Sequence, residues 1–278
     1  MNGNRAARTA PPVGGLVIRW ASLAYLAVMV VLPLAALAVR AAGPGASAFR
    51  QELINPFAIH ALKLTFATAL AMVVVNAITG TATAWVLVRY DFPGKGVMNA
   101  LIDVPFAVPT VVTGLMLVAL YGPTSTLGAI LGRHGLGVIY ETPGFVLALL
   151  FVSYPFVIRS VQPVLLELDR AEEEAAATLG ASGWTTFRRV TLPALVPAIL
   201  TGSALAFSRA LGEFGSVVMV AGNRPLETKT APMYIFGEIE GGNPHGALVV
   251  SAVLLACSLG ILVALNLLQR RGDRAHGR

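Results

Sequence analysis

Two ionisable residues, Arg209 and Glu213, interrupt an otherwise apolar stretch of the chain. Charges within an apolar span are costly, so they mark a functional position by default. A spacing of four residues places both side chains on one face of a helix, where they neutralise each other. Three roles stay open for Arg209: contact with an anionic ligand, a structural or gating pair with Glu213, and pairing with a partner subunit.

The histidines and the single cysteine do not form a recognisable reactive group. His60, His134 and His245 are expected in outer loops and His276 in the C-terminal tail, and none of them has metal-ligand spacing. Cys257 lies in an apolar run and has no second cysteine to pair with. An intramembrane enzyme would need two carboxylates, or a serine with lysine or histidine, at membrane depth. We therefore predict no catalytic residue and no metal site.

The chain that must position these charges is strongly apolar. Of its 278 residues, 56% are hydrophobic and 12% are charged, and the mean hydropathy is +0.74. That charged fraction is about half of what a soluble domain carries, which argues against a water-soluble enzyme. Six windows lack Asp, Glu, Lys, Arg and His, at residues 20–39, 64–88, 104–132, 142–158, 191–208 and 246–269. Because a spanning helix needs about 20 apolar residues, we predict an all-α polytopic membrane protein with six transmembrane helices.

The first window has an alternative interpretation. It follows several arginines, and Ala36 with Ala38 would fit the cleavage site of a signal peptide. Its apolar run of about 20 residues is longer than the usual signal core of about 7–15. We interpret it as an uncleaved first span, which gives one transmembrane domain at residues 16–271 between an N-terminal tail, 1–15, and a C-terminal tail, 272–278.

The basic residues fix an expected orientation for six spans. An inner N-terminus collects thirteen of them on the inner side, namely Arg5, Arg8, Arg19, Arg89, Lys95, Arg159, Arg170, Arg188, Arg189, Arg270, Arg271, Arg274 and Arg278. Six fall on the outer side, namely Arg40, Arg50, Lys63, Arg133, Arg224 and Lys229. The positive-inside rule then predicts that both termini are cytoplasmic. The net charge of +6 is scattered along the chain and does not indicate a nucleic-acid partner.

One inner loop, residues 167–193, differs from the others because it is polar yet strongly helical in composition. Asp169 stands three residues before Glu172, as in an acidic variant of the capping box, so a short helix is expected there. Gly180 is placed to end that helix as a left-handed residue, and Ser182 to cap a second one. We expect Pro193 to open the next span. A helix, a glycine turn and a helix on the inner face suit docking into another protein, although a solvated amphipathic surface helix gives the same pattern.

The spacing within this loop resembles the signature of the membrane subunits of bacterial ABC importers. That signature is E-A-A, three residues, G, nine residues, I, one residue and L-P. This chain matches it with valine for isoleucine, at Glu174, Ala175, Ala176, Gly180, Val190, Leu192 and Pro193. The resemblance implies the type I permease fold, with this loop as the coupling helix that docks into a cytoplasmic ATPase. No P-loop is present, because Gly94-Lys95 lacks the required context. We expect no cofactor in this chain, with ATP and Mg²⁺ used by the partner ATPase.

The resemblance covers about residues 16–271 and is closest to sulfate/thiosulfate permease subunits, the first of two related ones. It is carried by residues 105–110, 151–164 and 210–218. Molybdate/tungstate permeases are similar around residues 212–215 and are the second candidate. The resemblance implies a bacterial inner (plasma) membrane protein that pairs with a second permease subunit, two ATPase copies, a periplasmic sulfate-binding protein and membrane lipid. An ATP-independent secondary transporter or channel is the alternative outside this family.

Several polar residues are candidates for the translocation path or its gate. The candidate set is Thr110, Arg209, Gly212, Glu213, Gly215 and Ser216. The two glycines allow close helix approach or a local break, and Thr113, Ser203 and Ser208 add hydroxyls that also suit bonding to their own backbone. Arg159 lies at the inner end of the fourth window, where we expect it to snorkel.

Overall fold

The computed structural model describes residues 13–276, and the regular structure within that range is helical. The all-α prediction is confirmed for this range. The helices are α1 (Val13–Leu26), α2 (Leu32–Ala42), α3 (Ala46–Leu53), α4 (Pro56–Arg89), α5 (Lys95–Ala107), α6 (Thr110–Tyr121), α7 (Thr126–Arg133), α8 (Thr142–Glu167), α9 (Arg170–Thr178), α10 (Gly183–Thr186), α11 (Leu192–Leu211), α12 (Gly215–Val220), α13 (Ala231–Glu240) and α14 (Pro244–His276). Two π-helical turns, Ala27–Val31 and Phe187–Thr191, join α1 to α2 and α10 to α11.

Within the described residues, five helical stretches are long and apolar enough to cross a membrane. They are Gly15–Ala42, Pro56–Arg89, Thr142–Glu167, Gly183–Leu211 and Pro244–Ala264. A sixth span is obtained only when α5 and α6 are counted together, and these two helices meet at an angle of 113°. The expected number of spans is therefore reached, but one of the six is broken.

The break between α5 and α6 corrects the prediction of a continuous span across residues 104–132. Pro109 has no N–H and drives the preceding residue out of the helical region, and Val108 is extended at φ −84° and ψ 126°. Pro109 is also the N-cap of α6, and no side chain caps that end. The first N–H groups of α6 therefore lack acceptors within their own helix.

The fifth span begins earlier than predicted. Its helical stretch starts at Gly183, ten residues before Pro193. Pro193 is the second residue of α11 and does not open the span, contrary to our prediction. The π turn explains how the helix runs through this region, because the Leu192 N–H donates to the Phe187 carbonyl, five residues back. The widened turn ends directly before the proline, which has no N–H to continue the pattern.

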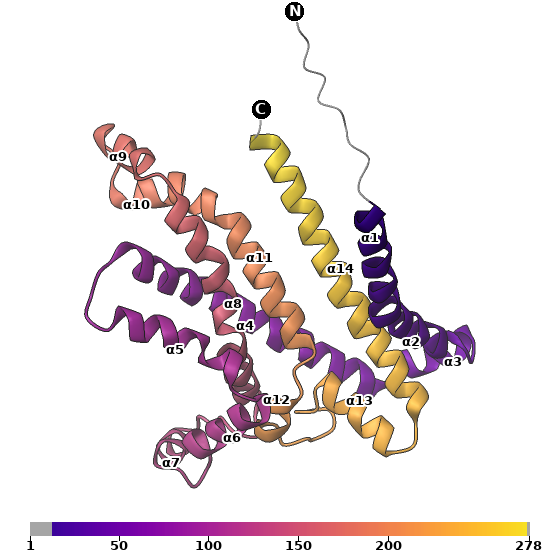
Figure 1. The fold of residues 1–278 in the computed structure, drawn as a ribbon. Coiled ribbons are helices and arrows are strands. Elements are labelled where there is room, and N and C mark those ends of the chain that lie inside the picture. The colour runs from indigo at the N-terminus through magenta and orange to yellow at the C-terminus, as the bar shows by residue number, and fades with distance from the viewer. Residues whose placement is uncertain (1–12, 277–278) are drawn as a thin grey trace, which may run out of the picture.

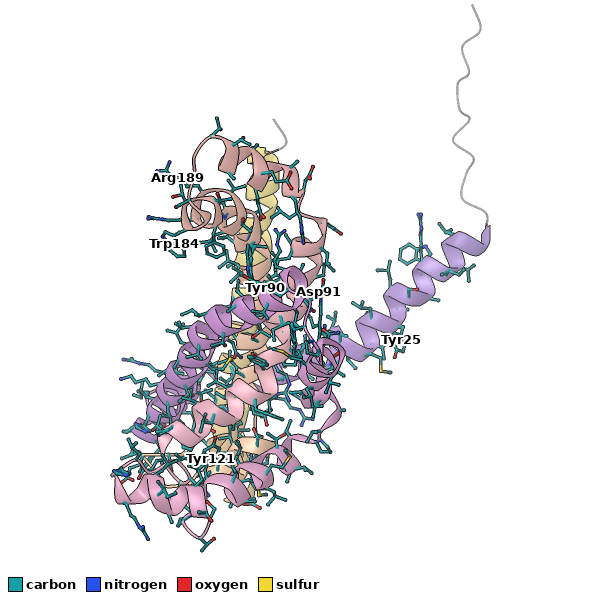
Figure 2. The ribbon with its side chains drawn as sticks, turned by 90° about the vertical axis from the view of Figure 1, so that its left-hand side faces the viewer. Tyr25, Tyr90, Asp91, Tyr121, Trp184 and Arg189 are labelled. Atoms are coloured by element: carbon teal, nitrogen blue, oxygen red, sulfur yellow. The ribbon has the colours of Figure 1, made fainter. Side chains whose placement is uncertain are left out.

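The core forms where α8 packs between α4 and α11. A β-carbon added to Gly80 of α4 would lie 3.0 Å from the Val157 β-carbon, and one added to Gly202 of α11 would lie 2.7 Å from the Val157 α-carbon. Small residues thus let three backbones approach closely, as membrane helices commonly do. By contrast, none of the apolar window within Gly15–Ala42 is buried, and Figure 2 shows α1, marked by Tyr25, leaning away from the bundle.

Different helices lie at the two ends of the bundle. The first turn of α1 and the last turn of α14 lie at the same end as α9 and α10, whereas α7, α12 and α13 lie at the other end (Figure 1). Helix α14 continues to His276, past the predicted end of the membrane domain at residue 271. The remainder of the two predicted tails, residues 1–12 and 277–278, lies outside the described residues.

Candidate functional site

The α9–α10 segment, residues 167–193, has the predicted helix, glycine turn and helix. The Asp169 carboxylate accepts the Ala171 N–H at 2.9 Å and caps α9. Gly180 follows α9 with φ +82°, in the left-handed region. The Gly180 N–H donates to the Ala177 carbonyl at 2.9 Å, and the Ala181 N–H donates to the Ala176 carbonyl at 3.0 Å. This pair of bonds is the Schellman motif that a left-handed glycine permits, so the predicted turn is confirmed.

The second short helix also starts where expected. The Ser182 hydroxyl accepts the Thr185 N–H at 3.3 Å as the N-cap of α10. No residue of α9 is buried, and Leu179 and Trp184 are exposed beside the turn. Figure 2 shows Trp184 and Arg189 at this end of the molecule. The segment thus presents apolar and charged side chains on an uncovered surface.

The signature residues divide between two parts of this segment. Glu174, Ala175 and Gly180 are exposed on α9 and its turn, and Ala176 is half-buried. Val190 and Leu192, both half-buried, lie on the π turn and at the start of α11, followed by the exposed Pro193. The first group can contact a partner directly, whereas the second forms the base on which the segment joins the membrane helix.

The sequence patterns missed Glu173, which lies between two exposed glutamates. Its carboxylate pairs with Arg89 at the end of α4 and accepts a hydrogen bond from Thr191 on the π turn. The sequence signal that could have indicated this ion pair was the position of Arg89 at the inner end of an apolar window. Its partner follows 84 residues later, and no local periodicity connects the two.

Arg209 and Glu213 form the expected ion pair, with 2.6 Å between Nη1 and Oε2. The expectation that they share one helix face is wrong, because α11 ends at Leu211 and Glu213 lies in the break before α12. The other carboxylate oxygen of Glu213 accepts the Ser216 N–H at 2.9 Å and the Ser216 hydroxyl at 2.8 Å. Glu213 therefore joins the end of α11 to the start of α12.

The start of α6 lies against the start of α12 beside this pair. A β-carbon on Gly215 would lie 2.2 Å from the Thr110 hydroxyl oxygen, and one on Gly114 would lie 2.6 Å from the Met219 β-carbon. Both glycines are thus required by close packing. Gly212 is not, because a β-carbon there would meet nothing within 4 Å and its φ of −95° suits any residue. The six predicted path residues lie together at this junction, with Gly212 at the C-cap of α11, but Gly212 has no steric role there.

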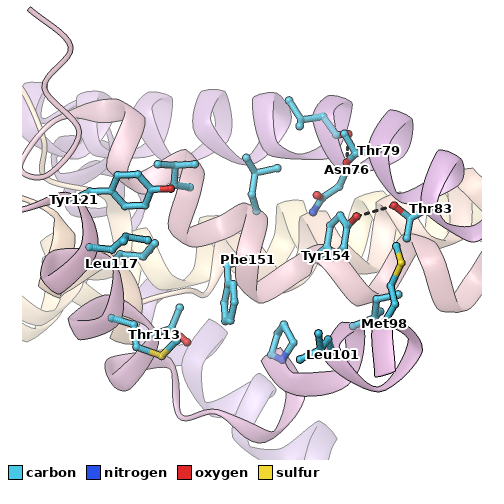
Figure 3. Close-up of a pocket in the computed structure, with 17 residues that line it drawn as sticks. Asn76, Thr79, Thr83, Met98, Leu101, Thr113, Leu117, Tyr121, Phe151 and Tyr154 are labelled. Atoms are coloured by element: carbon cyan, nitrogen blue, oxygen red, sulfur yellow. Dashed lines mark hydrogen bonds between the residues drawn. The ribbon is translucent and has the colours of Figure 1, made fainter. Parts of the chain in front are cut away.

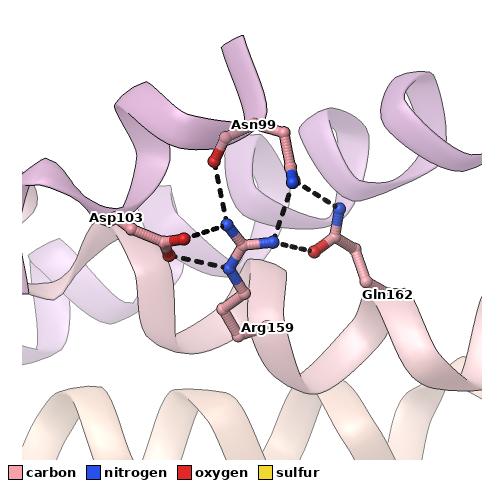
Figure 4. A network of polar contacts seen from close by, with 4 residues as sticks. All are labelled: Asn99, Asp103, Arg159 and Gln162. Carbon is pink, nitrogen blue, oxygen red and sulfur yellow. Dashed lines mark hydrogen bonds and ion pairs between the residues drawn. The ribbon is translucent and has the colours of Figure 1, made fainter. Parts of the chain in front are cut away.

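Arg159, which we expected to snorkel, has its guanidinium engaged by several polar groups of the protein. It pairs with the Asp103 carboxylate at 2.5 Å and donates to the Asn99 carbonyl at 2.9 Å. It also donates to the side-chain oxygens of Asn99, at 2.9 Å, and Gln162, at 2.6 Å. This network fastens the broken span at α5 to the continuous helix α8 (Figure 4).

A cavity of about 720 Å³ lies between α4, α5, α6 and α8 (Figure 3). Its walls are mostly apolar, and the Thr83 and Tyr154 hydroxyls are hydrogen-bonded at 2.7 Å. Two buried atoms at its wall, Asn76 Oδ1 and Thr113 Oγ1, have no hydrogen-bond partner. A second hollow of about 890 Å³ lies between α4 and α11, beside the aromatic residues Trp85, Trp184 and Phe187.

The histidines do not occupy the predicted loops throughout. His60 lies within α4 and His245 within the first turn of α14, whereas His134 follows the end of α7. The placement in loops is therefore wrong for His60 and His245, because both helices begin before the apolar windows. Among the described residues, no three His, Cys, Asp or Glu side chains are grouped to hold a metal ion.

A bundle of apolar spans, with an ion pair at a helix break and an uncovered helix-turn-helix at one end, defines a multi-pass membrane protein of the permease class. Residues 78–275 match the family described as binding-protein-dependent transport system inner membrane component. The chain belongs to this family and is a multi-pass inner-membrane protein.

Two curated relatives and one solved structure indicate how far the similarity extends. The sulfate transport system permease protein CysT of Synechocystis sp. is 46% identical over 253 residues, which cover 91% of this chain and 88% of that protein. The protein of the same name from Escherichia coli K12 is 40% identical over 253 residues, 91% of each chain. A chain of a bacterial alginate ABC transporter, in complex with a periplasmic protein, has a TM-score of 0.76 at 17% identity and covers 92% of this chain and 93% of its own. The fold is thus that of ABC importer permeases of type I.

Proposed function

We propose that this chain is the membrane-spanning subunit of an ATP-driven importer of sulfate and thiosulfate. The observation that carries the proposal is identity of 40–46% to sulfate permeases over about 90% of the chain. Such similarity over about nine-tenths of the chain is consistent with a shared cargo as well as a shared fold. In this function the chain forms half of the translocation path and has no ATPase site of its own.

The α9–α10 segment is the part of this subunit that docks into a cytoplasmic ATPase. Its exposed α9 surface and the match to the importer signature support this role. ATP and Mg²⁺ are used by two copies of that ATPase, so the energy enters through the segment. The proposal requires α9, and with it both termini, to be cytoplasmic. The thirteen basic residues assigned to that side, and the shared end of the bundle in Figure 1, support this orientation.

The translocation path runs beside the junction of α11, α12 and α6. Arg209 supports this proposal because its side chain is 36% exposed, while its Nε and Nη2 atoms have no acceptor among the described residues. A guanidinium with free donors suits a tetrahedral dianion, and pairing with Glu213 keeps the attraction weak enough for release. Thr110, Gly215 and Ser216 form the tightly packed wall behind it.

The subunit works with three kinds of partner. A second permease subunit, or a second copy of this chain, supplies the other half of the path, and the uncovered face of α1 supports the need for it. A periplasmic sulfate-binding protein delivers the anion to the outer side. Lipid surrounds the remaining apolar surface.

A molybdate or tungstate importer is the second candidate, favoured by the likeness at residues 212–215 around the ion pair. Sulfate and molybdate are both tetrahedral dianions, so the permease alone discriminates poorly between them. The binding protein supplies most of the specificity.

The test is uptake of labelled sulfate by proteoliposomes that contain the complete transporter and its binding protein. We expect uptake to require ATP on the ATPase side, and unlabelled thiosulfate to compete at least ten-fold better than molybdate. Stronger competition by molybdate would favour the second candidate. Uptake without ATP would instead indicate a secondary transporter and overturn the proposal.

A further inference from the structure

One carboxylate oxygen of Glu173 joins three separate parts of the chain. Oε1 lies 2.5 Å from Nη2 of Arg89, the last residue of α4. The same oxygen accepts a hydrogen bond from the Thr191 hydroxyl at 2.9 Å. Glu173 itself lies in the first turn of α9. The first turn of the α9–α10 segment is therefore tied at once to the end of one spanning helix and to the π turn that leads into another.

This junction is shielded from water although it lies at the surface end of the bundle. The Arg89 side chain is 9% exposed and that of Glu173 is 22% exposed, and Thr191 is fully buried. The neighbouring Glu172 and Glu174 are exposed. A shielded, charge-assisted contact holds its geometry much better than a surface pair, because water competes for it less.

Aromatic rings fix the arginine from its other side. The Arg89 guanidinium carbon lies 5.1 Å from the centre of the Trp85 ring, within cation–π range. Trp85 meets Phe187 edge to face at 5.4 Å, and Phe187 stacks on Trp184 at 5.6 Å. The second helix of the segment, α10, is thus linked to the end of α4 through Phe187 and Trp85, and Trp85 also holds the arginine.

A run of three glutamates at a helix N-terminus has a simpler explanation, which is that negative charge stabilises the helix dipole. That explanation applies equally to Glu172, Glu173 and Glu174. It does not account for the shielding of the middle side chain, or for its two partners on other helices. Although no residue of α9 is fully buried, the Glu173 carboxylate ties the first turn of this helix to the spanning bundle.

We propose that Glu173 is the positioning residue through which movement of the α9–α10 segment is passed to α4 and α11. The proposal rests on the proposed docking of this segment to an ATPase. A pull on α9 reaches α4 through Arg89 and reaches α11 through Thr191. The π turn containing Thr191 is a wider, less regular stretch of helix, of the kind that often lies at functional positions.

The test uses the complete reconstituted transporter with Glu173→Gln, which keeps the shape of the side chain and removes its charge. We expect the subunit to insert and to retain the ATPase, with ATP hydrolysis within two-fold of wild type. We expect the number of sulfate ions imported per ATP hydrolysed to fall at least ten-fold. A role limited to folding would change the amount of complex recovered and leave this ratio unchanged.

Asp91→Asn is the matched control. Asp91 forms an ion pair with Lys95 at 2.8 Å close to the end of α4, but its side chain is 98% exposed. The same carboxylate-to-amide change there should leave both uptake and hydrolysis unaltered. Thr191→Val removes only the link to α11 and should lower the ratio about three-fold. Arg89→Gln combined with Glu173→Gln should be no worse than Glu173→Gln alone, because the arginine acts through that carboxylate.

The proposal is overturned if Glu173→Gln imports sulfate with the wild-type ratio while the wild-type complex shows ATP-dependent uptake. It is also overturned if the variant loses the ATPase, because Glu173 would then belong to docking or folding. Absence of ATP-dependent uptake by the wild-type complex would overturn the proposed function itself, and the coupling role with it.

Discussion

At the scale of single residues, Arg209 and Glu213 are unequal partners. The Glu213 side chain is 2% exposed and uses both oxygens, whereas that of Arg209 is 36% exposed and uses one nitrogen. Arg209→Met leaves a buried carboxylate without its cation, at a cost of about 3 kcal/mol, because pairs that lose one partner are penalised by about that much or more. We expect Arg209→Met and Glu213→Gln each to reduce complex recovery and sulfate uptake.

The double variant decides between the roles of this pair. If the main role of the pair is mutual charge neutralisation, the double variant Arg209→Met with Glu213→Gln regains part of the complex recovery and sulfate uptake that each single variant loses. If Arg209 mainly contacts the anion, the double variant is as inactive as Arg209→Met, which then folds normally. Complex recovery and uptake measured on all three variants separate these outcomes. Arg224→Met, which breaks an exposed pair with Glu227 at 2.8 Å, is the control for complex recovery.

The sequence predicted this pair but not its surroundings. Charges in an apolar stretch are visible without a structure, and a spacing of four residues makes contact geometrically natural. The bonds from Ser216 and the contact between Gly215 and Thr110 depend on where helices end and cross. Likewise, Arg159 lies at the end of an apolar window, where a sequence alone suggests snorkelling. Only the fold brings Asn99 and Asp103 within reach of its guanidinium.

At the scale of elements, the turn after α9 makes a direct prediction. Gly180 has φ +82° and open space around its α-carbon, so a substitution there is limited by backbone conformation and not by collision. We expect Gly180→Val to insert normally but to lose at least five-fold in ATPase association and uptake, because β-branched residues avoid the left-handed region. Co-purification of the ATPase in mild detergent measures the effect.

Two further variants test that reasoning. Gly180→Asn should be milder than Gly180→Val, because asparagine tolerates the left-handed region. Gly132→Val, in α7, has ordinary φ and equally open space and should change nothing. Wild-type uptake and association by Gly180→Val would mean that this turn does not shape the docking surface.

Helix ends could be predicted from the sequence where hydrogen bonds between near neighbours define them. They could not be predicted where an apolar window continues through a bend in the chain. Asp169, Gly180 and Ser182 act within three or four residues of themselves, so their roles could be read from spacing. The windows at residues 104–132 and 191–208 show only that charged residues are absent, not where a helix bends. Pro109 was a visible signal for the break between α5 and α6. Proline also occurs inside the intact helix α8, so a proline alone does not predict a break.

At the scale of the whole molecule, the uncovered α1 predicts contact with a partner. Leu23 and Met29 are exposed although they belong to a span whose apolar window is entirely unburied. With Cys257 replaced by serine, we expect a photo-cross-linker attached at Leu23→Cys or Met29→Cys to capture the second permease subunit in the assembled transporter. The molecular mass of the cross-linked product on a denaturing gel gives the answer.

A position buried in the bundle is the control for this experiment. Ala61, which is 1% exposed within α4, should yield only cross-links within the chain after the same substitution. Capture of lipid alone from both positions, Leu23 in α1 and Met29 in the π turn that follows it, would contradict the prediction and leave this span facing lipid. The number of spans and their hydropathy were predictable from composition, whereas the detachment of α1 was not, because its apolar surface suits lipid and protein equally.

The uncapped start of α6 has a consequence for where water must reach in this protein. Its first-turn N–H groups have no capping side chain behind Pro109, and hydrocarbon would penalise each unpaired group by several kcal/mol. Gly215 of α12 packs against this helix end but adds no side-chain acceptor. Lipid tails alone therefore cannot complete this end of α6, and water or a polar group of another polypeptide must reach it.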